Sequence, residues 1–273
     1  MLIDLKKILF YLLSILSGNR FAQELLGWNV KISKLLMGIG TGVYPKSSGE
    51  HILGKLLFRF SKDKKNPLII FDVGANEGQF SKILKSELEN IEYFIHAFEP
   101  NSMAFYKLKE NFGDNNHFIL NNFGLGNEIC NVKLHYDKPN SLRASVYHQN
   151  LDHLGISFDY HEIIHLDTLD HYCLQNNIAY IDLLKLDVEG YEINILEGSK
   201  KALHQGKIKK ISFEFGECFI SSRNYFKDIY SFLQSYEMKA LFRITPTGYL
   251  YPVEEYNEKY EQFSTTNFLA IMN

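Results

Sequence analysis

Short apolar runs alternate with helical stretches from residue 67 onward, and this alternation restricts the fold more than any other feature of the chain. The pattern is typical of β-α-β units, whose strands form a mainly parallel sheet with helices packed on its faces. We therefore expect an α/β fold with seven strands, the last two paired as an antiparallel hairpin. The expected strands cover residues 67–73, 92–98, 117–121, 181–186, 210–215, 239–244 and 267–271.

Helices are expected before and between these strands, at residues 48–60, 79–88, 102–111, 169–176, 191–203 and 225–236. A further pair of strands is expected at 131–136 and 163–166. The stretch 137–162 between them is rich in Asn, Ser, His and Tyr and is too long for a simple connection. Insertions of this length in α/β units are more often lids or binding loops than structural filler.

Residues 1–66 read as a helical extension, and the lysine-rich stretch 61–67 marks its boundary with a domain at 67–273. Near its start, two lysines precede a nine-residue apolar run at 8–16, far short of the ~20 residues that cross a bilayer. A helix packed on the domain is the favoured interpretation; a helix on the membrane surface and a secretion signal are the alternatives. We expect a cytoplasmic protein, with residues 1–20 as the candidate contact to the inner face of the membrane.

The composition argues against two classes of site. A formal net charge of −3 over 273 residues gives no general attraction for nucleic acid, so no such partner is expected. Cys130, Cys173 and Cys218 are widely spaced and form no Cys-x-x-Cys pair, which disfavours a disulfide framework and a zinc site. We expect reduced thiols.

A strand runs directly into a glycine turn and a helix at FDVGANEG, residues 71–78. Such a turn brings backbone N–H groups and a helix N-terminus close to a bound ligand, and Gly74 and Gly78 stand where a Cβ would block the ligand or distort the turn. Asn76 replaces the middle glycine of a dinucleotide fingerprint, which suits the amino-acid moiety of S-adenosylmethionine (SAM) better than a pyrophosphate. A purely structural turn is the alternative.

The second expected strand ends in Ala-Phe-Glu-Pro-Asn, with Glu99 25 residues after Gly74. An acidic residue near this spacing is placed to accept hydrogen bonds from both ribose hydroxyls of a nucleoside. No arginine accompanies it, which disfavours a 2′-phosphate. A lone glutamate would more often be a solvated strand end, but the glycine turn favours ribose binding.

Two further strands deliver carboxylates to the same edge of the sheet. The strand at 181–186 is followed by Asp187 and Glu189, and Glu214 lies near the end of the otherwise apolar strand at 210–215. Open α/β sheets bind ligands at this edge, where carboxylates act as bases, metal ligands or anchors for an ammonium group. A helix-capping acid is the alternative for the first pair.

These segments, in this order, resemble the FkbM family of SAM-dependent methyltransferases over roughly residues 67–273. The resemblance lies in FDVGANEGQF (71–80), AFEPN (97–101), NNFGLGN (121–127), IDLLKLDVEGYEINILEG (181–198), ISFEFGE (211–217) and NFLAI (267–271). It implies a Rossmann-like class I methyltransferase fold with strand order 3-2-1-4-5-7-6 and an antiparallel last strand. It also implies O-methylation, often of sugars in surface polysaccharides, glycolipids or glycosylated natural products. LLMGIGTG (35–42) and SSGE (47–50) resemble the extension of members from surface-glycan biosynthesis.

The resemblance also implies roles for individual residues. Asp72, Gly74, Asn76 and Gly78 would surround the methionine part of SAM, Glu99 would bind its ribose, and Asn122 and Phe123 would lie near its adenine. Asp187 would face the reacting centre as the first candidate for a general base, with Glu189 and Glu214 as partners. Metal-dependent O-methyltransferases of this fold place carboxylates where Asp187 and Glu214 stand, so Mg²⁺ is a candidate second cofactor.

Other candidate bases and other functions stay open from the residues alone. His96 reads as a core histidine, and the histidines of the insertion as solvated. The alternatives to an enzyme acting on a glycan acceptor are a non-catalytic SAM- or nucleotide-binding module and a methyltransferase for a non-sugar small molecule. A short-chain dehydrogenase is disfavoured, because Tyr230, Tyr236 and Tyr256 are not followed by Lys at the fourth position.

Overall fold

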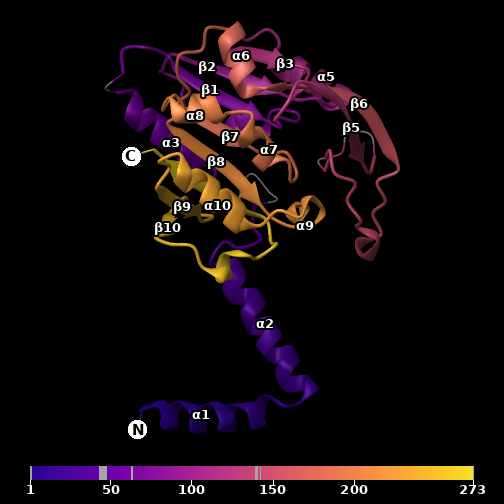
Figure 1. Cartoon of the computed structure of the whole chain (residues 1–273), viewed down its shortest axis with the longest axis vertical. Helices are drawn as coiled ribbons and strands as arrows, with labels where there is room; N and C mark the ends of the chain where they lie inside the picture. The colour runs from indigo at the N-terminus through magenta and orange to yellow at the C-terminus, as the bar shows by residue number, and fades with distance from the viewer. Residues whose placement is uncertain (1, 43–47, 63, 139–140, 142, 273) are drawn as a thin grey trace.

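A twisted sheet with helices on both faces forms the body of the molecule (Figure 1). The computed structural model describes residues 2–42, 48–62, 64–138, 141 and 143–272. Within these residues the large sheet has eight strands in the order β3-β2-β1-β7-β8-β11-β9-β10. The strands are β1 Leu68–Val73, β2 Tyr93–Phe98, β3 Phe118–Asn121, β7 Leu183–Leu186, β8 Lys210–Phe215, β9 Ala240–Ile244, β10 Leu250–Pro252 and β11 Thr266–Ile271.

The strand order confirms the Rossmann-like methyltransferase fold that the resemblance implies. Strands β3, β2, β1, β7 and β8 run parallel, while β11 lies antiparallel between β8 and β9. When the strands of the large sheet are numbered in chain order and β10 is left out, their order across the sheet is 3-2-1-4-5-7-6. The short strand β10 was not predicted; it pairs with the outer edge of β9, and it occupies part of the connection that the expected hairpin would have made.

The two faces of the sheet carry separate apolar cores, as the two-residue period of a strand requires. In β1, Leu68 and Ile70 contact one core while Phe71 and Val73 contact the other. The first core is covered by α3 His51–Ser61, α4 Gln79–Glu87 and α5 Ser102–Phe112. The second core is covered by α6 Leu169–Gln175, α7 Glu192–Glu197, α8 Lys200–His204, α9 Cys218–Ser222 and α10 Phe226–Ser235.

The helix expected at 191–203 is divided into α7 and α8 at Gly198 and Ser199. A second sheet approaches closely at this point: a Cβ on Gly198 would lie 1.9 Å from the backbone oxygen of Gly126. Within the described residues this sheet has three strands in the order β4-β6-β5. Its strands are β4 Gly124–Gly126, β5 Cys130–Tyr136 and β6 Tyr160–Thr168.

The expected pairing of 131–136 with 163–166 is confirmed, since β5 and β6 pair antiparallel from Cys130 opposite Leu166 to Tyr136 opposite Tyr160. Strand β4 was not predicted. It is short and rich in glycine, so it carries no strand pattern that a sequence shows, and its position beside β6 is decided by tertiary contacts.

The N-terminal segment does not pack as one unit. Helices α1 Leu2–Ser17 and α2 Arg20–Leu36 extend away from the domain (Figure 1), and α2 buries no residue. The favoured expectation of a helix packed on the domain, made for residues 1–20, is therefore wrong, since residues 6–15 are exposed. Helix α3, by contrast, buries Leu53 and Leu57 in the core. The division at residue 66 stays a prediction, and Ser47 of the SSGE motif lies outside the described residues.

Among the described residues, each helix is either too short or too polar to cross a membrane.

The turn after β1 yields a stability prediction. Gly74 has a φ of +81°, and a Cβ there would lie 1.8 Å from the backbone oxygen of Asp187, whereas Gly155 has a φ of +69° with nothing within 4 Å. Gly155→Ala should therefore cost only about 1–2 kcal/mol, the cost of a left-handed alanine. Gly74→Ala should cost about 1–3 kcal/mol more, because β1 and β7 must separate. Urea unfolding of both variants checks this, and equal losses would contradict it.

Candidate functional site

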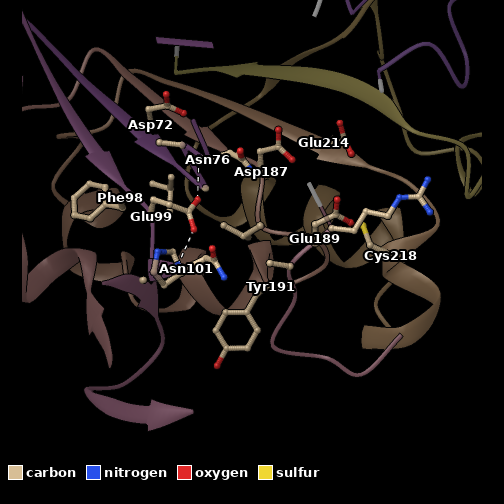
Figure 2. A pocket seen from close by; sticks show the side chains of 18 of the residues that line it. Asp72, Asn76, Phe98, Glu99, Asn101, Asp187, Glu189, Tyr191, Glu214 and Cys218 are labelled. Atoms are coloured by element: carbon tan, nitrogen blue, oxygen red, sulfur yellow. Dashed lines mark hydrogen bonds between the residues drawn. The ribbon is translucent and has the colours of Figure 1, made fainter. Parts of the chain in front are cut away.

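A cavity of about 480 Å³ opens at the carboxyl ends of β1, β2, β7 and β8. This is the edge where open α/β sheets bind ligands, and the volume is in the range of small-molecule sites. Figure 2 shows the polar side chains that meet there. Asp72, Gly74, Asn76, Glu99, Asp187, Glu189 and Glu214, all predicted from the sequence, line it.

The glycine turn is held by backbone contacts to β2. The N–H groups of Gly74 and Ala75 both donate to the carbonyl of Phe98, at 3.0 Å each. Gly78 does not line the cavity; a Cβ there would lie 2.3 Å from a ring carbon of Phe112 on α5. Both glycines are thus required for close packing of the chain around the site, and Gly74 also lines the cavity.

Asn76 occupies the left-handed region with a φ of +48°, which asparagine tolerates better than most residues. Its side-chain oxygen accepts a hydrogen bond from the backbone N–H of Glu77 at 2.7 Å. Its own backbone N–H donates to the Glu99 carboxylate at 2.8 Å. Asn76 therefore connects the first strand's turn to the acid at the end of the second.

Glu99 is the best-defined acid of the site. Its carboxylate accepts the backbone N–H groups of Asn76 and Asn101, both at 2.8 Å, as the dashed lines of Figure 2 show. Burial raises its pKa to about 7, despite the lowering effect of these two hydrogen bonds. Each carboxylate oxygen has two lone pairs, so one on each oxygen remains for a ligand hydroxyl. The geometry suits recognition of a diol.

Asp72, near the end of β1, is hydrogen-bonded to the helix that follows the turn. It is buried, and its carboxylate accepts the hydroxyl of Ser81 on α4 at 2.6 Å. Burial raises its pKa to about 6, against the lowering effects of Ser81 and Lys185.

A buried lysine in β7 organises the other side of the cavity. Lys185 is 1% exposed and lies 2.9 Å from Asp187 Oδ2 and 3.2 Å from Glu50 Oε1. Burial alone would lower its pKa, but the charges of Asp187 and Glu50 outweigh burial and raise it. Neither Lys185 nor Glu50 was predicted as a site residue from the sequence. A lysine inside the apolar run LLKLD was the available signal, because a buried charge requires a partner.

Three further carboxyl groups crowd the turn after β7. Burial, with the charges of Asp187 and Glu192, raises the pKa of Glu189 to about 8, and burial raises that of Glu192 to about 8 as well. Burial also raises the pKa of Glu214 well above its ordinary value. Glu189 has a φ of +54°, a strained conformation of the kind found at functional sites. Glu192, which accepts the Val188 N–H at 3.1 Å, was also missed.

The residues present do not fit a Mg²⁺ site. No group of three or more His, Cys, Asp or Glu side chains in the described chain is arranged to hold a metal. One carboxylate oxygen of Asp187, Oδ2, already accepts a hydrogen bond from the ammonium group of Lys185. The expectation of a metal at Asp187 and Glu214 is not supported, because Lys185 supplies the positive charge there.

The insertion covers one side of the cavity, as expected of a binding loop. Ser141, Arg143, Ala144 and Val146 line the wall, and the Ser145 hydroxyl donates to the backbone oxygen of Glu189 at 2.8 Å. Because two loops are joined by this bond, the insertion and the turn after β7 hold each other in position.

Three other predicted residues lie away from the cavity wall or inside the core. Asn122 donates from its side chain to the backbone oxygen of Glu99 at 2.9 Å, and Phe123 packs against Phe98. Neither lines the cavity, so their contact with an adenine stays a prediction. His96 is a core histidine, as predicted: it bonds to the hydroxyl of Tyr172 at 2.8 Å, and burial lowers its pKa to about 4.

The sequence is similar to those of known methyltransferases. The family described as "Methyltransferase FkbM domain" matches residues 72–240. The 2-O-methyltransferase NoeI of Sinorhizobium fredii (strain NBRC 101917 / NGR234) is 23% identical over 190 residues, which cover 66% of this chain and 76% of NoeI.

Solved structures with similar folds share little sequence. Methyltransferase FkbM from Methylobacillus flagellatus KT aligns with a TM-score of 0.48 and 15% identity over 80% of this chain; the chain spans about half of that protein (47%). The N-terminal domain of human METTL16, in complex with SAH, aligns with a TM-score of 0.39 and 13% identity over 81% of this chain and 67% of that one.

The buried carboxyl groups predict how stability depends on pH. Glu99, Glu189 and Glu192 have pKa values of about 7, 8 and 8 in the fold, well above the ~4.3 of an unfolded glutamate. Between these values the folded state binds more protons than the unfolded state, so stability falls as pH rises. The unliganded protein should lose stability from pH 6.5 to 8.5, by at most about 1.4 kcal/mol per pH unit for each group.

Thermal unfolding over this range measures the slope. Glu192→Gln keeps the acceptor for the Val188 N–H but removes one titrating group, so its slope should be shallower. His96, whose pKa is lowered to about 4, contributes the opposite slope only below about pH 6.5. A midpoint that rises with pH above 6.5 would contradict the assignment.

Proposed function

The chain belongs to the FkbM methyltransferase family, and from this premise we propose that it is a SAM-dependent O-methyltransferase whose acceptor is a sugar hydroxyl. The observation that carries the proposal is that a single cavity has acidic side chains on two opposite sides. Glu99 lies on one side, and Asp187, Glu189 and Glu214 gather on the other, as Figure 2 shows.

The cofactor side would hold SAM through the groups that surround the first turn. Glu99 would accept the ribose hydroxyls with its free lone pairs, while Gly74 and Asn76 would lie along the methionine part. The residues fit such a ligand because Glu99 is buried and held by two backbone donors, so its orientation is set before binding. When bound, SAM supplies an electrophilic methyl group.

The acceptor side would orient a hydroxyl and take its proton. A sugar hydroxyl is a weak nucleophile at neutral pH and needs a base. Asp187 has one oxygen bonded to Lys185, which leaves the other to orient the hydroxyl. Glu189, whose pKa burial raises to about 8, has the proton affinity of a base that works near neutral pH. Tyr191 lines the same wall and offers a ring face on which a sugar can pack.

The relative NoeI supports O-methylation through its name, 2-O-methyltransferase. The two alternatives from the sequence make different predictions. A non-catalytic module would bind SAM without any turnover, and an enzyme for a non-sugar acceptor would methylate none of a panel of activated sugars and lipid-linked glycans. Such a panel with labelled SAM is the experiment that identifies the acceptor class.

Cofactor binding tests the role of Glu99. We expect micromolar affinity for SAM and its demethylated product by calorimetry, and loss of at least about tenfold in Glu99→Gln, because a neutral amide is a weaker acceptor than a carboxylate. In the wild type, affinity should rise as pH passes the Glu99 pKa of about 7, and this rise should be absent from Glu99→Gln. Tight binding of NAD without binding of SAM would refute the proposal.

Turnover tests the acceptor side. Glu189→Gln should keep SAM affinity and lose about 10²–10⁴-fold in turnover, the range for removal of a general base. Asp187→Asn should also keep SAM affinity and lose turnover, because the acceptor hydroxyl is no longer oriented. The rate of the wild type should rise with pH toward the Glu189 pKa of about 8, and Glu189→Gln should lose this rise whereas Asp187→Asn should retain it. Unchanged turnover would remove that residue from the candidate catalytic set.

A further inference from the structure

We call helices α1 and α2 the N-terminal arm (residues 2–36). Many apolar side chains of this arm are exposed to solvent. From Ile8 to Ile15 every side chain except Ser14 is apolar or aromatic, and these are 54% to 74% exposed. In α2, Phe21 and Leu36 are 77% and 80% exposed. Isolated exposed apolar residues are normal on a soluble surface, but a contiguous patch marks an interaction site.

The distribution of apolar side chains around the axis of α1 indicates what kind of partner covers this helix. Successive helical residues point about 100° apart, so a continuous apolar run faces every direction around the axis. A protein partner docked on one side would leave the opposite side exposed. Lipid can surround most of the run. With 16 residues, α1 is about 24 Å long, shorter than the ~30 Å hydrocarbon core, which suits a helix lying in the plane of the interface.

Helix α2 has a narrower apolar stripe. Phe21, Leu25, Trp28, Ile32 and Leu35 follow each other at intervals of four and three residues, a spacing that places them on one face of a helix. The break between α1 and α2 falls at Gly18 and Asn19, and the two helices meet there at a corner (Figure 1). Two helices that meet at a corner share a plane, so both can lie on one flat surface.

The charge of the arm differs from that of the whole chain. Residues 1–36 contain five lysines and arginines and two acidic residues, whereas the whole chain has a net charge of −3. Lys6 and Lys7 directly precede the apolar run, where they would meet lipid headgroups. Basic residues near a membrane surface are attracted by anionic lipids. The arm is therefore positive and apolar, while the rest of the chain is acidic.

We propose that the N-terminal arm is a membrane-surface anchor, with α1 embedded at the headgroup–acyl boundary of an anionic bilayer and the α2 stripe lying on the same surface. This anchor is independent of the methyl-transfer site, because neither helix contributes a residue to the cavity wall.

Vesicle binding by the full-length protein tests the anchor. The protein should sediment with vesicles of phosphatidylcholine and phosphatidylglycerol, and much less with phosphatidylcholine alone or at high salt. Trp28 is the only tryptophan of the chain and is 68% exposed, so its emission reports on α2 directly. It should shift to the blue on the anionic vesicles and be quenched by brominated acyl chains.

Matched substitutions identify the surface responsible. Phe10→Glu with Leu13→Glu should weaken partitioning at least about tenfold, since two apolar side chains become charged. Leu174→Glu changes a side chain on α6 that is as exposed as Phe10, at 73% against 74%, and this variant should bind as the wild type does. All three positions lie outside the apolar cores, so an unchanged unfolding midpoint will show that the domain is intact.

Three outcomes would overturn the proposal. The first is absence of sedimentation with anionic vesicles, and the second is sedimentation without a change in Trp28 emission. The third is a dimer in solution that ignores vesicles and dissociates in Leu25→Glu with Ile32→Glu, which would assign the stripe to a second copy of the chain.

Discussion

The buried ammonium group of Lys185 is the interaction on which the rest of the site depends. It lies in the central strand β7 and contacts Asp187 on its own strand end and Glu50 from the segment before α3. Removing one partner from a buried ion pair typically costs about 3–5 kcal/mol, because the other charge is left without compensation. The lysine thus holds the segment before α3 against the sheet and fixes one oxygen of Asp187.

The cavity around Lys185 contains several carboxyl groups whose pKa values are raised mainly by burial. Burying them costs stability, and such groups are retained where they serve a site. Glu99 and Glu189 illustrate two uses of the same physical effect. Glu99 is fixed by two backbone donors and is suited to hold a ligand, whereas Glu189 lies on a strained turn and is suited to exchange a proton.

Apolar side chains are buried in the domain but exposed in the N-terminal arm. In the domain, apolar side chains are divided between two cores on the faces of one sheet. In α1 and α2 similar side chains remain exposed. Both segments are helical because helix formation needs only local hydrogen bonds, while burial needs a partner surface that the domain does not provide.

The sequence by itself determined the class of fold, its parallel strands and most of the acids at their carboxyl ends. It could do so because a strand followed by a tight turn leaves a local pattern, as at FDVGANEG and LKLDVEG. Only the tertiary structure decided what depends on distant contacts: the pairing of Lys185 with Glu50, the strand β4, the close approach of Gly126 to Gly198, and the exposure of the arm. Glu50 and Lys185 are 135 positions apart, and no local pattern records that they meet.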